Sequence, residues 1–447
     1  MIVTTLEQVK ALVEQQGIKF FLCSFVEMSG APKAKLVPAT HLEDMAEGSA
    51  GFAGFAAGEM GQGPHDPDLI AIPDFNSVTV VPWRKGLAWV ASTIQVNGEA
   101  WPYCPRTILQ RQLERAKQQG YVLNVGVEAE FMLLRRDEQG SYAPWDSLDT
   151  LGKPCYDLRA LHRNLDILTT LVTYVQELGW DPYANDHEDA NCQFELNWRF
   201  ADALTTSDRH TFFKWMVKTV AEEHGLLATF MPKPFARLTG NGAHCHLSLW
   251  DADNRTNLFL DESDESGLSQ LAYWFTGGLL HHARALAAVT NPIVNSYKRL
   301  IRGAPRSGAT WAPVYTTYGG SNRTQMIRIP APGRIENRIV DGAANPYLAC
   351  TAILAAGLDG IERRIDPGPR NDDNLYEVPE EELRRRGIGF LPATLSEALD
   401  CLEADDVILG ALGPQYAAAY VRAKREEWRQ YHLTVSPWEI EQYLELH

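Results

Sequence analysis

The chain has 447 residues, 45% of them hydrophobic, and its 41 basic and 57 acidic side chains give a net charge of −16. This balance is typical of a globular protein and argues against nucleic acids and anionic membranes as main partners. The seven cysteines form no CxxC pair, which argues against a disulfide framework. No apolar run reaches the ~18 residues of a membrane span, and the charged N-terminus is unlike a signal peptide. We therefore expect a cytoplasmic protein.

The first hundred residues are predicted to form a small domain. An amphipathic helix ending at Gly17 precedes short strands, and Pro102 and Pro105 then break the pattern. The helix is predicted over 4–17 and the strands over 19–28, 33–39, 77–82 and 87–96. Between them, the segment 48–63 is rich in Gly, Ala and Phe and is predicted to be a loop. We therefore divide the chain into 1–103 and 104–447.

Helices and strands alternate in the second part. A helix is predicted over 106–119, a strand over 122–134 and one long helix over 158–178. The acidic segment 366–395 contains Pro and Gly and is predicted to be an exposed loop. The C-terminal stretch around Trp438 is predicted to form a helix that docks on another subunit, with folding back on its own core as the alternative.

Two carboxylates lie close together on the predicted strand GVEAEFML. Glu128 and Glu130 are two residues apart and therefore share one face, while Val127, Ala129 and Phe131 share the other. Two carboxylates this close repel each other unless a cation lies between them. A solvated strand face is the alternative interpretation.

Two further segments carry candidate ligands. Glu188 and Glu195 flank the turn in NDHEDANCQFELNW, although a surface hairpin explains this pair equally well. In GNGAHCHLSLW, His244, His246 and Ser248 share one face of a predicted strand. A hydrogen-bonded histidine pair is the alternative there.

Arginines surround the last candidate carboxylate, Glu336 in GRIENRIVDG. Such arginines suit phosphate and carboxylate recognition, and a surface salt-bridge ladder is the alternative. The arginines are Arg323, Arg328, Arg334 and Arg338. Together with His244, the five carboxylates offer the ligands that two or three Mg²⁺ or Mn²⁺ ions require. No GxxxxGK[ST] loop is present, so metals and arginines would have to hold the phosphates of ATP in a phosphoryl transfer.

These motifs, in this order, resemble the glutamine synthetase family nearly end to end. VEAEF, GNGAHCHLSLW, NPIVNSYKRL, SNRTQMIRIP, GRIENRIVDGAANPYLA and NDDNLYEVP all match it. The resemblance implies an α+β fold with an N-terminal β-grasp domain and a catalytic domain on a curved antiparallel sheet with flanking helices. It also implies ATP-dependent coupling of glutamate to an amine through γ-glutamyl phosphate. Active sites would lie between subunits of hexameric rings, commonly stacked as a dodecamer.

The resemblance also assigns roles to individual residues. Glu130, Glu188 and Glu195 match ligands of the metal near glutamate, and Glu128, His244 and Glu336 match ligands of the metal on ATP. Gly240, Arg299 and Arg338 match glutamate contacts. Arg323, Arg328 and Arg334 match the phosphate side, whereas His246 and Ser248 match nucleotide contacts. Glu188, Arg323 and Arg338 are the predicted catalytic residues, with Arg323 and Arg338 also contacting substrate.

The departures from the family pattern concern the amine. Ala53 stands where the family has an Asp, Ala56 stands at a Ser, and the flap glutamate is missing, with Pro305 near its position. Thr239 also replaces an Asn. Because a bare ammonium ion needs anionic partners, small apolar residues favour an amine that carries a methyl or larger group. This pattern resembles the branch with glutamate–methylamine ligases and type III glutamate–ammonia ligases.

We therefore predict a γ-glutamyl–amine ligase for methylamine or another small primary amine, with Ala53 and Ala56 at the substrate. The alternatives are a glutamine synthetase using ammonia, a polyamine or ethanolamine γ-glutamylation enzyme, and a non-catalytic ring-forming paralogue. A polyamine would require acids at the pocket mouth, where Glu59 and Asp66 are candidates. Tyr376 matches a position that some family members adenylylate, a weak prediction here. Cys192 stands at a usual Gly and is predicted to be buried and inert.

Overall fold

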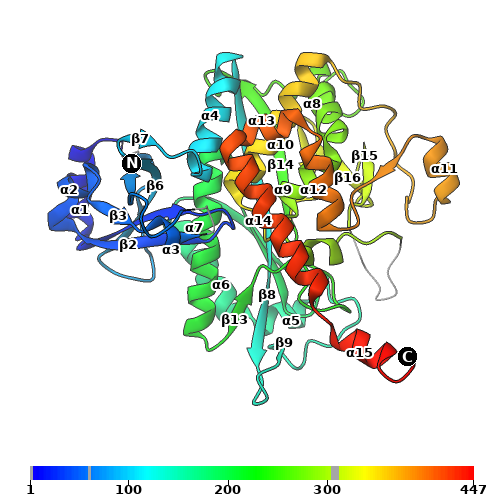
Figure 1. Ribbon diagram of the computed structural model, residues 1–447, viewed down its shortest axis with the longest axis horizontal. Helices are drawn as coiled ribbons and strands as arrows, with labels where there is room; N and C mark the ends of the chain where they lie inside the picture. Colours follow the sequence, from blue (N-terminus) through cyan, green and yellow to red (C-terminus); the bar gives the residue numbers. More distant parts are fainter. Residues whose placement is uncertain (1–3, 59–61, 304–311) are drawn as a thin grey trace.

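The computed structural model describes residues 4–58, 62–303 and 312–447, which form two β-sheets with helices packed around them (Figure 1). The predicted α+β fold class is confirmed by this architecture. Glu59, Pro305 and most of the predicted flap lie outside the described residues. Among the described helices, none is long and apolar enough to cross a membrane.

The first sheet lies in the N-terminal part of the chain, in blue at the left of Figure 1. Its main strands follow the order β2-β1-β6-β4-β3, with a parallel β1–β6 pair among antiparallel neighbours. The strands are β1 (Phe20–Val26), β2 (Pro32–Pro38), β3 (Ala50–Phe52), β4 (Leu69–Pro73), β5 (Thr79–Val80), β6 (Leu87–Val96) and β7 (Glu99–Ala100). Helices α1 (Leu6–Gln16), α2 (Leu42–Ala46) and α3 (Gly54–Ala57) accompany them.

Helix α1 ends at Gly17 as its sequence predicts, and it begins at Leu6, two residues after the predicted start. The Thr5 hydroxyl accepts a hydrogen bond from the Gln8 backbone N–H, and the Gln8 side chain accepts one from the Thr5 N–H. This reciprocal pair is a capping box. At the other end Gly17 has φ 64°, the left-handed conformation that favours glycine.

The second sheet carries the polar motifs. Its main strands follow the order β10-β11-β8-β14-β17-β16-β15-β18, and among the described pairs all are antiparallel except β15–β16. The strands are β8 (Tyr121–Arg136), β9 (Tyr142–Pro144), β10 (Pro182–His187), β11 (Gln193–Trp198), β12 (Ala201–Asp202), β13 (Leu227–Thr229), β14 (Ala243–Asp251), β15 (Tyr315–Gly319), β16 (Gln325–Ala331), β17 (Arg334–Asn337) and β18 (Gly389–Phe390).

Helices cover the apolar face of this sheet. Phe131 of β8 is fully buried and packs against Phe213 of α7, with ring centroids 6.3 Å apart. The helices of this part of the chain, not all of which lie on that face, are α4 (Pro105–Gln118), α5 (Leu158–Arg163), α6 (Leu165–Glu177), α7 (Ala203–Glu223), α8 (Gln270–His281), α9 (Ala283–Thr290), α10 (Pro346–Arg363), α11 (Glu380–Arg385), α12 (Leu395–Glu403), α13 (Asp406–Leu412), α14 (Pro414–Leu433) and α15 (Pro437–Tyr443). Burial on one face leaves the alternate residues of β8 and β14 available for a polar site.

Three predictions of local structure were wrong in part. The long helix over 158–178 is two helices, because Asn164 is not helical (φ −106°, ψ 6°) and its amide oxygen accepts a hydrogen bond from Trp145. The segment 48–63 contains β3 and α3 rather than a loop alone. The segment 366–395 contains α11 and β18, and a Glu380–Arg384 pair one helical turn apart supports α11.

Buried ion pairs connect the N-terminal part of the chain with the rest. Arg106 at the start of α4 is buried and pairs with Asp74 of the N-terminal part and with Asp208 of α7.

The C-terminal helix α15 projects from the body of the chain (Figure 1), and the Trp438 side chain is 59% exposed. The alternative in which this helix folds back on its own core is therefore wrong.

Candidate active site

Three neighbouring strands bring the first group of predicted ligands together. In the antiparallel registers, Glu128 of β8 lies opposite His244 of β14, and His246 of β14 lies opposite Glu336 of β17. Directly opposed side chains share a face of the sheet. The polar residues that alternate along β8, β14 and β17 therefore form one polar surface across these three strands.

Glu128, His244 and Glu336 form a compact group in which one ligand atom from each lies within 4.8 Å of the others. His244 Nδ1 is 3.2 Å from Glu128 Oε2 and 3.5 Å from Glu336 Oε1, and His246 Nε2 is 2.6 Å from Glu128 Oε1. Burial would raise the pKa of Glu128, but hydrogen bonds with the two histidines hold it well below its usual range. The carboxylate is therefore anionic where a cation would bind.

Glu336 is fully buried between two arginines. Arg328 Nη1 lies 2.8 Å from Glu336 Oε2, and Arg338 pairs with the other carboxylate oxygen. The charges of Arg338 and His244 outweigh burial and lower the pKa of Glu336 to about 2. The surface salt-bridge ladder, which was the alternative for these arginines, is wrong for Glu336 because the pairs are buried.

Glu130, Glu188 and Glu195 form the second group, again with one oxygen from each within 4.8 Å of the others. Glu195 lies opposite Glu130 in register, and the Gly242 N–H donates to Glu130 Oε2 at 2.8 Å. Burial, together with the charges of neighbouring carboxylates, raises the pKa values of Glu188 and Glu195 well above their usual range. A cation between the three oxygens would relieve this repulsion, and an all-oxygen donor set fits Mg²⁺ or Mn²⁺.

A buried hydrogen-bond network fixes the turn between Glu188 and Glu195. Asp149 accepts hydrogen bonds from the Cys192 backbone N–H at 2.6 Å and from Asn191 Nδ2 at 3.1 Å, and it lies 2.7 Å from His187 Nε2. His187 Nδ1 is 2.8 Å from the Glu188 carbonyl oxygen. Cys192 has φ 58°, which explains why glycine suits this position, and it is fully buried as predicted.

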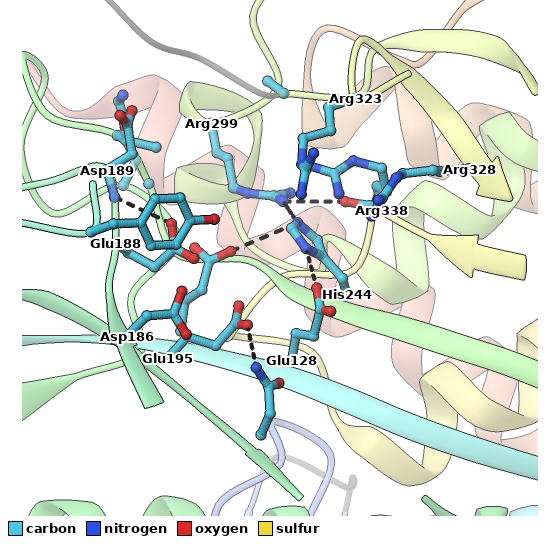
Figure 2. A pocket seen from close by; sticks show the side chains of 17 residues that line it. Glu128, Asp186, Glu188, Asp189, Glu195, His244, Arg299, Arg323, Arg328 and Arg338 are labelled. Atoms are coloured by element: carbon cyan, nitrogen blue, oxygen red, sulfur yellow. Dashed lines mark hydrogen bonds and ion pairs between the residues drawn. The ribbon is translucent and has the colours of Figure 1, made fainter. Parts of the chain in front are cut away.

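A cavity of about 220 Å³ opens over both groups (Figure 2). Acidic side chains lie on one side of this view, while Arg299, Arg323, Arg328 and Arg338 lie on the other. Arg299 is held by hydrogen bonds from its Nη2 to the Arg338 carbonyl at 3.2 Å and from its Nη1 to the Ile339 carbonyl at 3.1 Å. The arrangement can bind an anionic substrate on the arginines with divalent cations beside it.

An adjoining cavity of about 490 Å³ shares Glu128 with the first. His246, Ser248 and Arg334 line it, as do Phe200 and Trp250, whose ring centroids are 6.0 Å apart. A polar edge with aromatic faces is suited to a nucleotide base and ribose. The predicted nucleotide contacts thus lie together beside the predicted phosphate side.

Most predicted site residues line these two cavities, and three do not. The first cavity is lined by Glu128, Glu130, Glu188, Glu195, Gly240, His244, Arg299, Arg323, Arg328 and Arg338. Glu336 is fully buried and is absent from the described lining of both cavities. Ala53 and Ala56 of the N-terminal part are absent from both linings as well. Their predicted place beside the substrate would therefore require the N-terminal part of a neighbouring copy.

The cavity also contains residues that the sequence interpretation missed. Tyr156, Asp186, Asp189 and Lys233 line it, and Thr239, noted above as a departure, lies there too. Alternation could have identified Asp186, which is two residues before Glu188. Tyr156 lies in a connection before α5, and no local pattern indicates that this connection reaches the cavity. Asp186 has a pKa raised to about 6 by burial and by the charges of Glu128 and Glu130.

Comparison with known proteins gives a consistent result. Residues 102–443 match the family model described as glutamine synthetase, catalytic domain. The chain is 46% identical over 436 residues to a glutamine synthetase of Rhizobium leguminosarum bv. phaseoli, covering 98% of this chain and 99% of the relative. The chain belongs to the glutamine synthetase family.

Other members of the family are equally similar. A glutamate–methylamine ligase of Methyloversatilis universalis is 46% identical over 441 residues, covering 98% of this chain and 99% of the relative. The solved structure named "GmaS/ADP complex-Conformation 1" superposes with a TM-score of 0.91 at 51% identity, covering 97% of this chain and 99% of that chain. Like these relatives, the chain is a ligase that forms a carbon–nitrogen amide bond.

Proposed function

We propose that this ligase uses ATP to join glutamate to methylamine or another small primary amine. The γ-carboxylate of glutamate takes the γ-phosphoryl group of ATP, which leaves ADP and γ-glutamyl phosphate. The amine nitrogen, after loss of one ammonium proton, then attacks the γ-carbonyl carbon, and phosphate leaves. The observation that carries the proposal is the meeting of two acidic groups and four arginines at one cavity.

The first half of this reaction depends on charge. Glu128, His244 and Glu336 would hold one divalent cation and Glu130, Glu188 and Glu195 another, and bound there the ions would offset the negative charge of the phosphates. Arg323 and Arg328 offer further positive charge on the opposite side of the cavity (Figure 2). Arg299 and Arg338 would orient the carboxylates of glutamate.

The second half depends on the residues that surround the amine. Ala53 and Ala56 add no carboxylate to this region, so a methyl group would be buried there with a gain of about 0.8 kcal/mol. The similarity to a glutamate–methylamine ligase supports the same preference. Glu188 remains beside the cavity as an acidic group for the amine.

Ammonia is the second candidate nitrogen donor. Relatives named glutamine synthetase are as similar to the chain as the methylamine ligase is. Asp186 and Asp189 also line the cavity and supply two further carboxylates. These two acids could compensate for the missing acidic residues.

Phosphate release decides between the two donors. The purified protein would be assayed with ATP, Mg²⁺ and glutamate while ammonium, methylamine, ethylamine, ethanolamine and putrescine are varied in turn. We expect the highest kcat/KM for methylamine or ethylamine. A higher kcat/KM for ammonium would overturn the alkylamine assignment, and release that is independent of any amine would overturn the ligase reaction proposed here.

A ring of subunits is also part of the proposal. Ala53 and Ala56 line neither of the two cavities described above, which is consistent with another copy supplying them. The C-terminal segment exposes apolar side chains, including Leu433, Trp438 and Leu444. Both features are expected of a chain whose active site and C-terminus contact other subunits. Light scattering of the purified protein would give the mass, and a monomer that is fully active would overturn this part.

A further inference from the structure

Asp186 belongs to a row of three carboxylates that crosses the second sheet. It lies opposite Glu195 of β11, which in turn lies opposite Glu130 of β8. Directly opposed residues share a face, with Cβ atoms about 5 Å apart, and like charges in such pairs repel. The row therefore needs positive charge along its whole length.

The inner two members of this row already have a role. Glu130 and Glu195 belong to the second ligand group with Glu188, whereas Asp186 belongs to neither group of ligand atoms. Strand β10 is the edge of the sheet, so Asp186 stands at the outer end of the row. Its side chain lines the first cavity, close to Glu188 and Glu195 (Figure 2).

Asp186 and Asp189 both line the first cavity without belonging to a ligand group, and they differ in their contacts. Asp189 Oδ2 accepts a hydrogen bond from Thr239 Oγ1 at 2.6 Å, so that part of its charge is stabilised within the protein. In contrast, the carboxylate of Asp186 makes no hydrogen bond or ion pair with any residue that the structure describes. A partly buried anion without a protein partner is stabilised by a cation that enters the cavity.

We propose that Asp186 binds the ammonium head of the amine substrate beside Glu188. This inference rests on the proposed function, since it assigns a residue to the amine of that reaction. It explains how a site with alanines at 53 and 56 still attracts a cationic amine. The role is binding alone, and no proton transfer is assigned to Asp186.

The test is Asp186→Asn, which keeps the size of the side chain and removes its charge. Phosphate release would be measured against methylamine and ammonium, glutamate, ATP and Mn²⁺ in separate titrations. Loss of a charged contact is expected to raise the KM for the amine about tenfold. The KM values for glutamate and ATP and the half-activating Mn²⁺ concentration are expected to stay within about twofold, well below the change for a lost charged contact.

Two further variants serve as controls for Asp186→Asn. Asp186→Glu retains the charge and is expected to recover most of the amine affinity, which also keeps the test informative if the Asn variant folds poorly. Asp166→Asn removes an exposed acid in the first turn of α6, outside both cavities, and is expected to leave all KM values unchanged.

The remaining outcomes separate this inference from the proposed function. An unchanged amine KM in Asp186→Asn overturns the inference, and so does a shift confined to Mn²⁺ activation, which would make Asp186 a metal contact. If the wild type prefers ammonium, the alkylamine assignment fails while the KM for ammonium still tests Asp186. If no nitrogen donor stimulates phosphate release, both proposals are overturned.

Discussion

Asp149 offers a stringent test of how the active-site turn is built. Its carboxylate is buried and accepts hydrogen bonds from the Cys192 N–H and Asn191, while His187 links it to the Glu188 carbonyl. His187 Nε2 lies 2.7 Å from Asp149 Oδ2, and His187 Nδ1 lies 2.8 Å from the Glu188 carbonyl oxygen. The change Asp149→Asn therefore removes a buried carboxylate that is hydrogen-bonded to the turn directly behind Glu188.

The expected effects have two parts. A buried group that loses its hydrogen-bond partner costs about 1–3 kcal/mol, and we expect the lower end, because Asn still offers an oxygen to the Cys192 N–H. Loosening of the turn should also displace Glu188. Changes behind metal ligands typically weaken metal binding by about 10–100-fold.

Thermal denaturation and Mn²⁺-dependent phosphate release measure these two effects separately. We expect Asp149→Asn to lower the melting temperature and to raise the half-activating Mn²⁺ concentration. His282→Gln is the matched control, because it removes another buried histidine–aspartate contact, at the end of α8 and far along the chain from this turn. The reasoning is refuted if Asp149→Asn destabilises the protein while Mn²⁺ activation stays at the wild-type value.

Three further results are expected. Glu336→Gln leaves Arg328 and Arg338 without their buried counter-charge and should lower kcat by about a hundredfold in phosphate-release assays; near-normal turnover would contradict its assigned role. Burial lowers the pKa of His282, but hydrogen bonds with Asp405 and Asp359 outweigh burial and raise this pKa above its usual value. The protonated ring therefore stabilises the folded protein fully below about pH 6.5, and this stabilisation is lost as the pH rises through the higher pKa of the folded state. The melting temperatures of wild type and His282→Gln should therefore differ more at about pH 6 than at about pH 9, and an equal gap would contradict this. Removal of divalent cations by EDTA should abolish activity and lower the melting temperature, and Mg²⁺ at about 100 times its Kd should restore about 2.7 kcal/mol of stability; an unchanged melting temperature would argue against cation binding in the folded state.

The sequence by itself determined the ligand positions on the strands. Because side chains alternate along a strand, the spacing of two residues is enough to place Glu128 with Glu130, and His244 with His246, on common faces. The residues between them, Ala129 and Cys245, are buried as this alternation requires. The end of α1 was also predicted from the sequence, where Gly17 stops the helix.

Tertiary structure decided which of these strands meet. The Glu128–His244 and Glu195–Glu130 registers join residues far apart in the chain, and no local pattern specifies such pairings. The same long-range packing brought Asp186 into the row of carboxylates and Tyr156 into the cavity. It also broke the predicted helix at Asn164, where a hydrogen bond from Trp145 accompanies the non-helical backbone. Periodicity reports which face of an element is buried, whereas the partner across that face depends on how the whole chain packs.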